Sequence, residues 1–294
     1  MIRSRTSARF GGKRAVGSAA AALLALGAAV GVGAPASAAA VVKINCPSAA
    51  CVQVASGVGG TPYSTVDGAG SLYLTFGGGE AFGGELHQVN LKTGAVRTVA
   101  TGLGNLRGVA VAGAYAYVAS FDGALQKVDI ATGSHTTLAS GLQALFGVGR
   151  HGNTTYATDG QGELIAVPDG GKARVVSSAV GFSEGIAFSA SGLVYTADMG
   201  AGNIVETNPA TGVSRILASQ AYEPTSISVG TDGQVYFLFG DEVIRLNPAT
   251  GQQTNVRDLE DPGIFEFSLT PGGSTAYAVD QVGGVWRIND VTGQ

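Results

Sequence analysis

The chain has 294 residues, with 21 acidic and 17 basic side chains, 47 glycines and 45% hydrophobic residues. Its first 38 residues hold five of the basic side chains and no acidic one, so the rest of the chain has a net charge of −9. That charge argues against a nucleic acid or an anionic membrane as a partner, because both require a basic surface. Abundant apolar residues together with many glycines argue against disorder and favour one domain rich in tight turns.

Residues 1–38 are typical of a cleaved signal peptide. Basic residues precede a small apolar stretch, 15–32, and Ala36-Ser37-Ala38 matches an A-x-A cleavage site. A membrane anchor is the alternative, although the apolar run is mainly Ala and Gly and ends at that site. No later stretch is long and apolar enough to span a bilayer. We therefore expect a secreted, extracellular protein without a membrane span, with the cell envelope as a second location.

Residues 39–50 are predicted to form a short N-terminal lead-in, followed by a single domain over 51–294. The two cysteines, Cys46 and Cys51, lie five positions apart where this domain begins. In an exported protein we expect them to form a disulfide, which closes a small loop and contributes about 2 kcal/mol. A metal-binding or redox pair is the alternative, although the spacing is not Cys-x-x-Cys.

A sequence repeat of four short apolar runs separated by glycine-containing turns occurs six times in the chain. The final glycines of its closing turn are separated by 39, 38, 41, 39 and 42 residues, at Gly94, Gly133, Gly171, Gly212, Gly251 and Gly293. The second run of each repeat carries a tyrosine, at Tyr73, Tyr117, Tyr156, Tyr195, Tyr236 and Tyr277. Four short antiparallel strands per repeat are typical of a propeller blade. The pattern predicts an all-β, six-bladed β-propeller.

The two ends of the domain predict how the ring closes. The sixth repeat stops at Gln294, where its fourth strand should begin, while 54–58 resembles the fourth strands at 99–103 and 138–142. We predict that this N-terminal strand completes the last blade and covers an otherwise open sheet edge. We also expect a monomer.

Charged and aromatic residues recur where the inner strands begin and the second strands end, and we expect both to meet at one mouth of the central channel. The first group is Arg107, Phe146, Glu184 and Glu266, and the second is Asp122, Asp159, Asp198 and Asp280. Clustered carboxylates suit calcium, with Glu184, Asp198, Asp159 and Asp280 as candidate ligands. In the alternative interpretation, each aspartate accepts backbone N–H bonds in its own turn.

Catalytic motifs give little support for an enzyme. The G-x-S-x-G match at 181–185 enters a predicted strand of an all-β repeat, whereas a nucleophile elbow joins a strand to a helix. None of the histidines, His87, His135 and His151, falls at the predicted mouth. We therefore assign no catalytic residue.

Segments 185–188, 192–198 and 202–205 resemble repeats of the NHL and SMP-30/gluconolactonase superfamily of six-bladed propellers, and of secreted propellers similar to streptogramin lyase. The resemblance implies the fold over nearly all of the mature chain, whereas its members include hydrolases, lyases and binding modules. In the gluconolactonase branch, a glutamate, an asparagine and an aspartate hold a divalent cation that activates a lactone or ester. Glu184 resembles that glutamate and Asp198 that aspartate.

We expect a binding or recognition module for a small molecule or an extracellular protein or glycan, with mouth residues Arg107, Glu266, Asp122 and Phe146. The alternative is a calcium-dependent hydrolase or lactonase at the acidic mouth, with calcium as its cofactor. A third possibility is a structural part of a larger extracellular assembly. A channel plugged by Phe146, Phe265 and an Arg107 paired to a carboxylate would favour the binding module.

Overall fold

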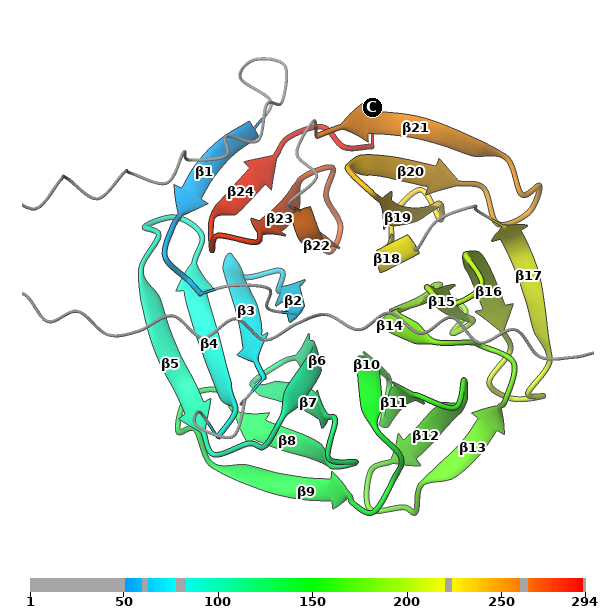
Figure 1. The fold of residues 1–294 in the computed structure, drawn as a ribbon, viewed down its shortest axis with the longest axis horizontal. Helices are drawn as coiled ribbons and strands as arrows, with labels where there is room; N and C mark the ends of the chain where they lie inside the picture. The colour runs from blue at the N-terminus through cyan, green and yellow to red at the C-terminus, as the bar shows by residue number, and fades with distance from the viewer. Residues whose placement is uncertain (1–50, 60–62, 78–82, 220–223, 260–263, 293–294) are drawn as a thin grey trace, which may run out of the picture. The chain divides into compact units, whose positions relative to one another are not determined.

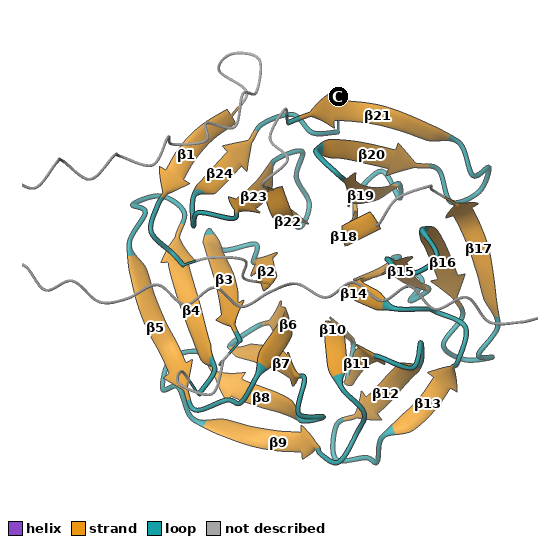
Figure 2. Ribbon diagram, in the orientation of Figure 1, coloured by secondary structure: helices purple, strands orange, loops and turns teal. Residues whose placement is uncertain are grey.

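The computed structural model describes residues 51–59, 63–77, 83–219, 224–259 and 264–292, and within the last range it does not describe the side chain of Phe265. The predicted signal peptide, the lead-in and Cys46 lie outside these residues, so export and the disulfide remain predictions. The described residues form strands and turns without a helix, as Figure 2 shows. They accordingly contain no helix long and apolar enough to cross a membrane.

Six four-stranded antiparallel sheets surround a central channel, which confirms the predicted propeller (Figure 1). From the channel outward, blade 1 contains β2 (Tyr63–Val66), β3 (Ser71–Phe76), β4 (Glu85–Asn90) and β5 (Val96–Thr101). Blade 2 contains β6 (Leu106–Ala112), β7 (Tyr115–Ser120), β8 (Leu125–Asp129) and β9 (His135–Ala139). Blade 3 contains β10 (Leu145–His151), β11 (Thr154–Asp159), β12 (Leu164–Pro168) and β13 (Arg174–Ser177).

The remaining blades repeat this order. Blade 4 contains β14 (Ser183–Phe188), β15 (Val194–Asp198), β16 (Asn203–Thr207) and β17 (Ser214–Ser219). Blade 5 contains β18 (Pro224–Val229), β19 (Val235–Phe239), β20 (Glu242–Leu246) and β21 (Gln253–Asp258). Blade 6 contains β22 (Ile264–Leu269), β23 (Ala276–Asp280), β24 (Val285–Ile288) and, as its outermost strand, β1 (Cys51–Ala55).

The ring closes as predicted. Strand β1 pairs antiparallel with β24, with Cys51 opposite Ile288 and Gln53 opposite Trp286. The first strand of the domain therefore completes the last blade and covers the edge of β24.

Hydrophobic packing between adjacent blades holds the ring together. In the described part of the chain, each of six buried clusters contains residues from two neighbouring blades. One joins Leu74 of β3 to Val279 of β23, across the junction between blades 1 and 6. The second strands are buried on both faces, which explains their nearly continuous apolar sequences.

The closing turn of one blade also contacts the outermost strand of the preceding blade. Gly94 has φ +72°, and a Cβ there would lie 2.5 Å from the carbonyl oxygen of Val54 in β1. The turn therefore needs glycine both for its left-handed backbone and for this close approach. In blade 3 the residue with positive φ is Gly170, and not Gly171, the final glycine of the closing turn.

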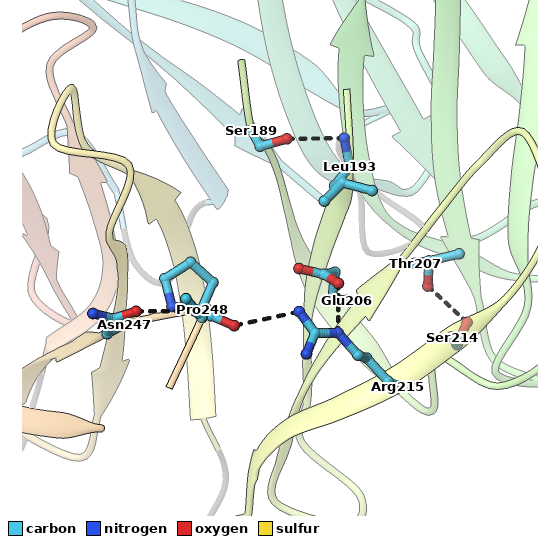
Figure 3. Close-up of polar contacts among 9 residues, drawn as sticks. Ser189, Leu193, Glu206, Thr207, Ser214, Arg215, Asn247 and Pro248 are labelled. Carbon is cyan, nitrogen blue, oxygen red and sulfur yellow. Dashed lines mark hydrogen bonds and ion pairs between the residues drawn. The ribbon is translucent and has the colours of Figure 1, made fainter. Parts of the chain in front are cut away.

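Arginines of the outer strands add polar contacts between blades. Arg215 of β17 donates from Nε to Oε1 of Glu206 (2.6 Å) and from Nη2 to the carbonyl oxygen of Pro248 in blade 5 (3.3 Å), as Figure 3 shows. Arg97 of β5 makes the equivalent bond to the carbonyl oxygen of Ile130 in blade 2 (3.0 Å).

Candidate functional site

The six inner strands together line a cavity of about 430 Å³ inside the channel. Its lining includes Tyr63, Glu184, Ser226 and Glu266, which lie at or near the starts of their strands, together with residues at the far ends of the inner strands, such as Phe188. Four polar side chains therefore lie at the end of the cavity nearest the predicted mouth.

A hydrogen bond spans the channel at this end. The hydroxyl of Tyr63 in blade 1 donates to Oε1 of Glu184 in blade 4, at 2.7 Å. The inner strands of these two blades face each other across the ring, as Figure 1 shows. Burial raises the pKa of Tyr63, and the charge of Glu184 and this hydrogen bond raise it further. Tyr63 therefore keeps its proton and acts as a donor.

Glu266 is a buried carboxyl beside the bridge. Its side chain is 6% exposed, and Ser226 of the neighbouring blade donates a hydrogen bond to its Oε2 at 2.8 Å. Burial raises the pKa of Glu266 well above its ordinary value, and the negative charge of Glu184 acts in the same direction. The two carboxyls are thus close enough for the charge of Glu184 to oppose the ionisation of Glu266.

On the mouth side, Arg107 lies among aromatic rings. Its guanidinium carbon is 5.3 Å from the ring centroid of Phe121 and 6.0 Å from those of Tyr63 and Phe146. Phe146 makes edge-to-face contacts with Phe121 (5.7 Å) and Phe182 (4.5 Å). We name these five residues, Tyr63, Arg107, Phe121, Phe146 and Phe182, the mouth cluster.

The guanidinium of Arg107 accordingly has unused donors. Within the described residues it makes no side-chain hydrogen bond or ion pair, and its Nε is buried without an acceptor. The carboxylate partner considered above for a plugged channel is therefore absent from this part of the chain. The aromatic rings contact the cation through cation–π interactions.

The predicted aspartates lie in separate turns. Asp159 accepts the N–H groups of Gln161 and Glu163 at 3.0 and 2.9 Å, and Asp280 accepts that of Gly284 at 2.6 Å. Such contacts match the alternative interpretation, in which each aspartate stabilises its own turn.

Asp198 follows the same pattern, whereas Asp122 accepts a backbone N–H from outside its own turn. Asp198 accepts the N–H groups of Gly200 and Ala201 at 3.0 and 3.2 Å, and Asp122 accepts that of Asn105 at 2.8 Å. Among the described residues, no three Asp, Glu, His or Cys side chains gather closely enough to hold a metal ion. The calcium site remains a prediction that no such cluster supports; its predicted ligands are Glu184, Asp198, Asp159 and Asp280.

Of the predicted mouth residues, the structure brings Arg107 and Phe146 together, and it places Glu184 and Glu266 beside Tyr63. Sequence reasoning missed Tyr63 as a site residue, although it occupies in β2 nearly the position that Glu184 occupies in β14. It also missed the roles of Phe121 and Phe182.

These features define a six-bladed β-propeller whose channel is crossed by a tyrosine–glutamate bridge beneath an arginine held by aromatic rings. The LVIVD repeat family matches residues 103–142, which include all four strands of blade 2. No curated protein matches the chain in sequence.

Solved structures with the same fold include both binding proteins and enzymes. A gluconolactonase from Xanthomonas campestris is 14% identical, with a TM-score of 0.68 over 81% of this chain and 89% of that one. A chain of a nidogen/laminin complex is 19% identical, with a TM-score of 0.60 over 72% and 86%. Virginiamycin B lyase from Staphylococcus aureus is 11% identical, with a TM-score of 0.60 over 81% and 98%. At these identities the likeness shows the fold alone.

Proposed function

We propose that the chain is an extracellular recognition module that binds its ligand at the mouth cluster. The observation that carries this proposal is the unused guanidinium of Arg107, held among aromatic rings of which Phe121 is 43% exposed. A cation with free donors beside an exposed ring offers both polar and apolar contacts to a ligand. The extracellular part of the proposal rests on the predicted signal peptide.

The hydrogen bonding of the acidic residues also supports binding over catalysis. Glu184 accepts from Tyr63, Glu266 accepts from Ser226, and Asp198 accepts from backbone groups of its own turn. The propeller in the nidogen/laminin complex is an example of this fold in an assembly with another protein.

A lactonase or esterase is the second candidate, because Glu184 and Glu266 line one cavity and a gluconolactonase has the same fold. The fit to calcium is poor among the described side chains, since the aspartates that would complete the ligand set are hydrogen-bonded in separate turns. We therefore derive no metal-dependent step.

A ligand screen by thermal shift tests the proposal. The chain from residue 39 would be screened against small molecules, peptides and glycans, in parallel with the Phe121→Ala and Glu266→Gln variants. We expect ligands that stabilise the wild type and Glu266→Gln but not Phe121→Ala, since only the last variant changes the mouth cluster. Ligands that depend on Glu266 but not on Phe121, or calcium-dependent hydrolysis of a lactone, would overturn the proposal and support the enzyme.

A further inference from the structure

We infer that the mouth cluster binds a monocarboxylate that carries a flat apolar group, such as an aromatic ring. This inference rests on the proposed function, because it names the ligand class for the same site. Three features of the cluster carry it: the free donors of Arg107, the acidic groups around them, and the exposed ring of Phe121.

The first feature requires an anionic acceptor. Arg107 is half-buried, and its guanidinium has no hydrogen-bond acceptor among the described residues. A buried cation without acceptors is unfavourable, and a ligand that supplies them removes that cost. The planar guanidinium presents parallel N–H donors that match the two oxygens of a carboxylate.

The second feature limits the charge of the ligand. Among the residues that begin the six inner strands, Arg107 is the only basic one, while Glu184 and Glu266 are acidic. Glu184 accepts from the hydroxyl of Tyr63, whose ring also contacts Arg107. A dianion such as a phosphate monoester would place surplus negative charge close to these carboxyls. One guanidinium therefore suits one carboxylate.

The third feature requires an apolar group next to the carboxylate. Phe121 is 43% exposed, lies 5.3 Å from the guanidinium and meets Phe146 edge-on. A flat ring bound to Arg107 can stack on Phe121 or approach it edge-on, which are the preferred geometries of aromatic pairs. An acetate-like ligand would leave this surface exposed.

Calorimetric titration with 3-phenylpropionate tests the inference. Three further probes each change one feature: 3-phenylpropionamide lacks the charge, propionate lacks the ring, and phenyl phosphate carries a second charge. We expect Arg107→Gln to raise the Kd for 3-phenylpropionate about ten- to a hundredfold, because a charge-assisted pair is lost. Phe121→Ala should raise it about two- to tenfold through the lost ring contact.

Matched variants separate these effects from general charge and from folding. Lys172→Gln removes one positive charge from an exposed turn and should leave the Kd unchanged. Arg107→Lys keeps the charge without the planar fork and should bind with intermediate affinity. Circular dichroism and melting curves of each variant check that the fold is retained.

The outcomes distinguish this inference from the proposed function. Three outcomes would overturn the carboxylate inference. They are equal affinity for the amide and the acid, tighter binding of phenyl phosphate than of 3-phenylpropionate, and no binding of 3-phenylpropionate at millimolar concentration. If neutral ligands still require Phe121, the mouth remains the binding site. If no ligand requires Phe121 or Arg107, both proposals fail.

Discussion

Glu184 and Glu266 share one end of the cavity, and their hydrogen bonds reduce the cost of placing two carboxyls there. Tyr63 donates to Glu184 and Ser226 donates to Glu266, while the raised pKa of Glu266 reflects its burial and the nearby charge of Glu184. The folded protein therefore holds the Glu266 proton to a higher pH than the unfolded chain does.

The first prediction concerns pH. Because the folded-state pKa of Glu266 is raised, its ionisation opposes folding, and the free energy of unfolding falls as pH rises from the ordinary carboxyl range to that raised pKa. We expect Glu266→Gln to raise the Tm at about pH 8 but much less at about pH 4, where the wild-type carboxyl is largely protonated in both states. Each kcal/mol by which the variant increases the free energy of unfolding should raise the Tm by about 2–4 °C.

Calorimetric scans across this pH range check the prediction. Glu184→Gln should weaken the same pH dependence, because removing its charge lowers the pKa of Glu266. Identical Tm values for Glu266→Gln and the wild type at every pH would contradict it.

Asp198 provides the second prediction, since its two proposed roles respond differently to substitution. Asp198→Ala removes the acceptor for the N–H groups of Gly200 and Ala201 and should cost about 1–3 kcal/mol. Asp198→Asn keeps an oxygen acceptor and should cost less. Denaturant melts with calcium and with EDTA should show the same losses. A calcium-dependent stabilisation that disappears in both variants would instead make Asp198 a metal ligand.

At the scale of single residues, the sequence predicted positions better than contacts. The repeat placed Arg107, Phe146 and Glu184 at inner-strand starts, because strand order fixes which backbone positions reach the mouth. It could not predict that Phe121 and Tyr63 surround Arg107, since these contacts join different blades and depend on side-chain directions.

At the scale of the blade, the closing turn joins one repeat to the next. Gly133 has φ +73°, and a Cβ there would collide with the carbonyl oxygen of Val99 in the preceding blade. In blade 3, Gly170 has a similar φ of +67° with no atom near the position of a Cβ. Substitution at Gly170 would therefore introduce backbone strain only, whereas substitution at Gly133 would also introduce a clash with the neighbouring blade.

The third prediction uses this pair. Gly170→Ala should cost about 1 kcal/mol through its left-handed backbone alone. Gly133→Ala should cost about 2–4 kcal/mol, because the neighbouring strand must also move. Urea unfolding of both variants measures the difference, and equal losses would show that the contact with Val99 has no energetic role.

The closing turn of blade 3 was not predicted correctly from the spacing of the repeats. Spacing predicted Gly171 as the blade 3 counterpart, yet Gly170 adopts the positive φ. The turn Asp169-Gly170-Gly171 offers two adjacent glycines, and backbone permissiveness alone does not distinguish them. The predicted number and order of strands were nevertheless correct, because the tyrosines and the other turns indicate them independently.

At the scale of the whole molecule, closure by β1 should prevent association of rings through the edge of β24. A chain that begins at residue 56 lacks β1 and exposes the edge of β24. We expect it to melt below the chain that begins at residue 39 and to associate with rising concentration, because open edges pair with other chains. Light scattering after gel filtration measures this association. A monomer with an unchanged Tm would show that β1 is dispensable.

The pairing of β1 with β24 also sets an order of events during synthesis. Cys51 and its partner Ile288 lie 237 positions apart, so the first strand of the domain made by the ribosome waits for the last. At about 5–20 residues per second this wait is on the order of 10–50 s. Blades 1 to 5 are each continuous in sequence and can form as they emerge, whereas blade 6 must wait until β24 has been made. Throughout that interval β1 is a strand without its partner, the part of the nascent chain most exposed to mispairing.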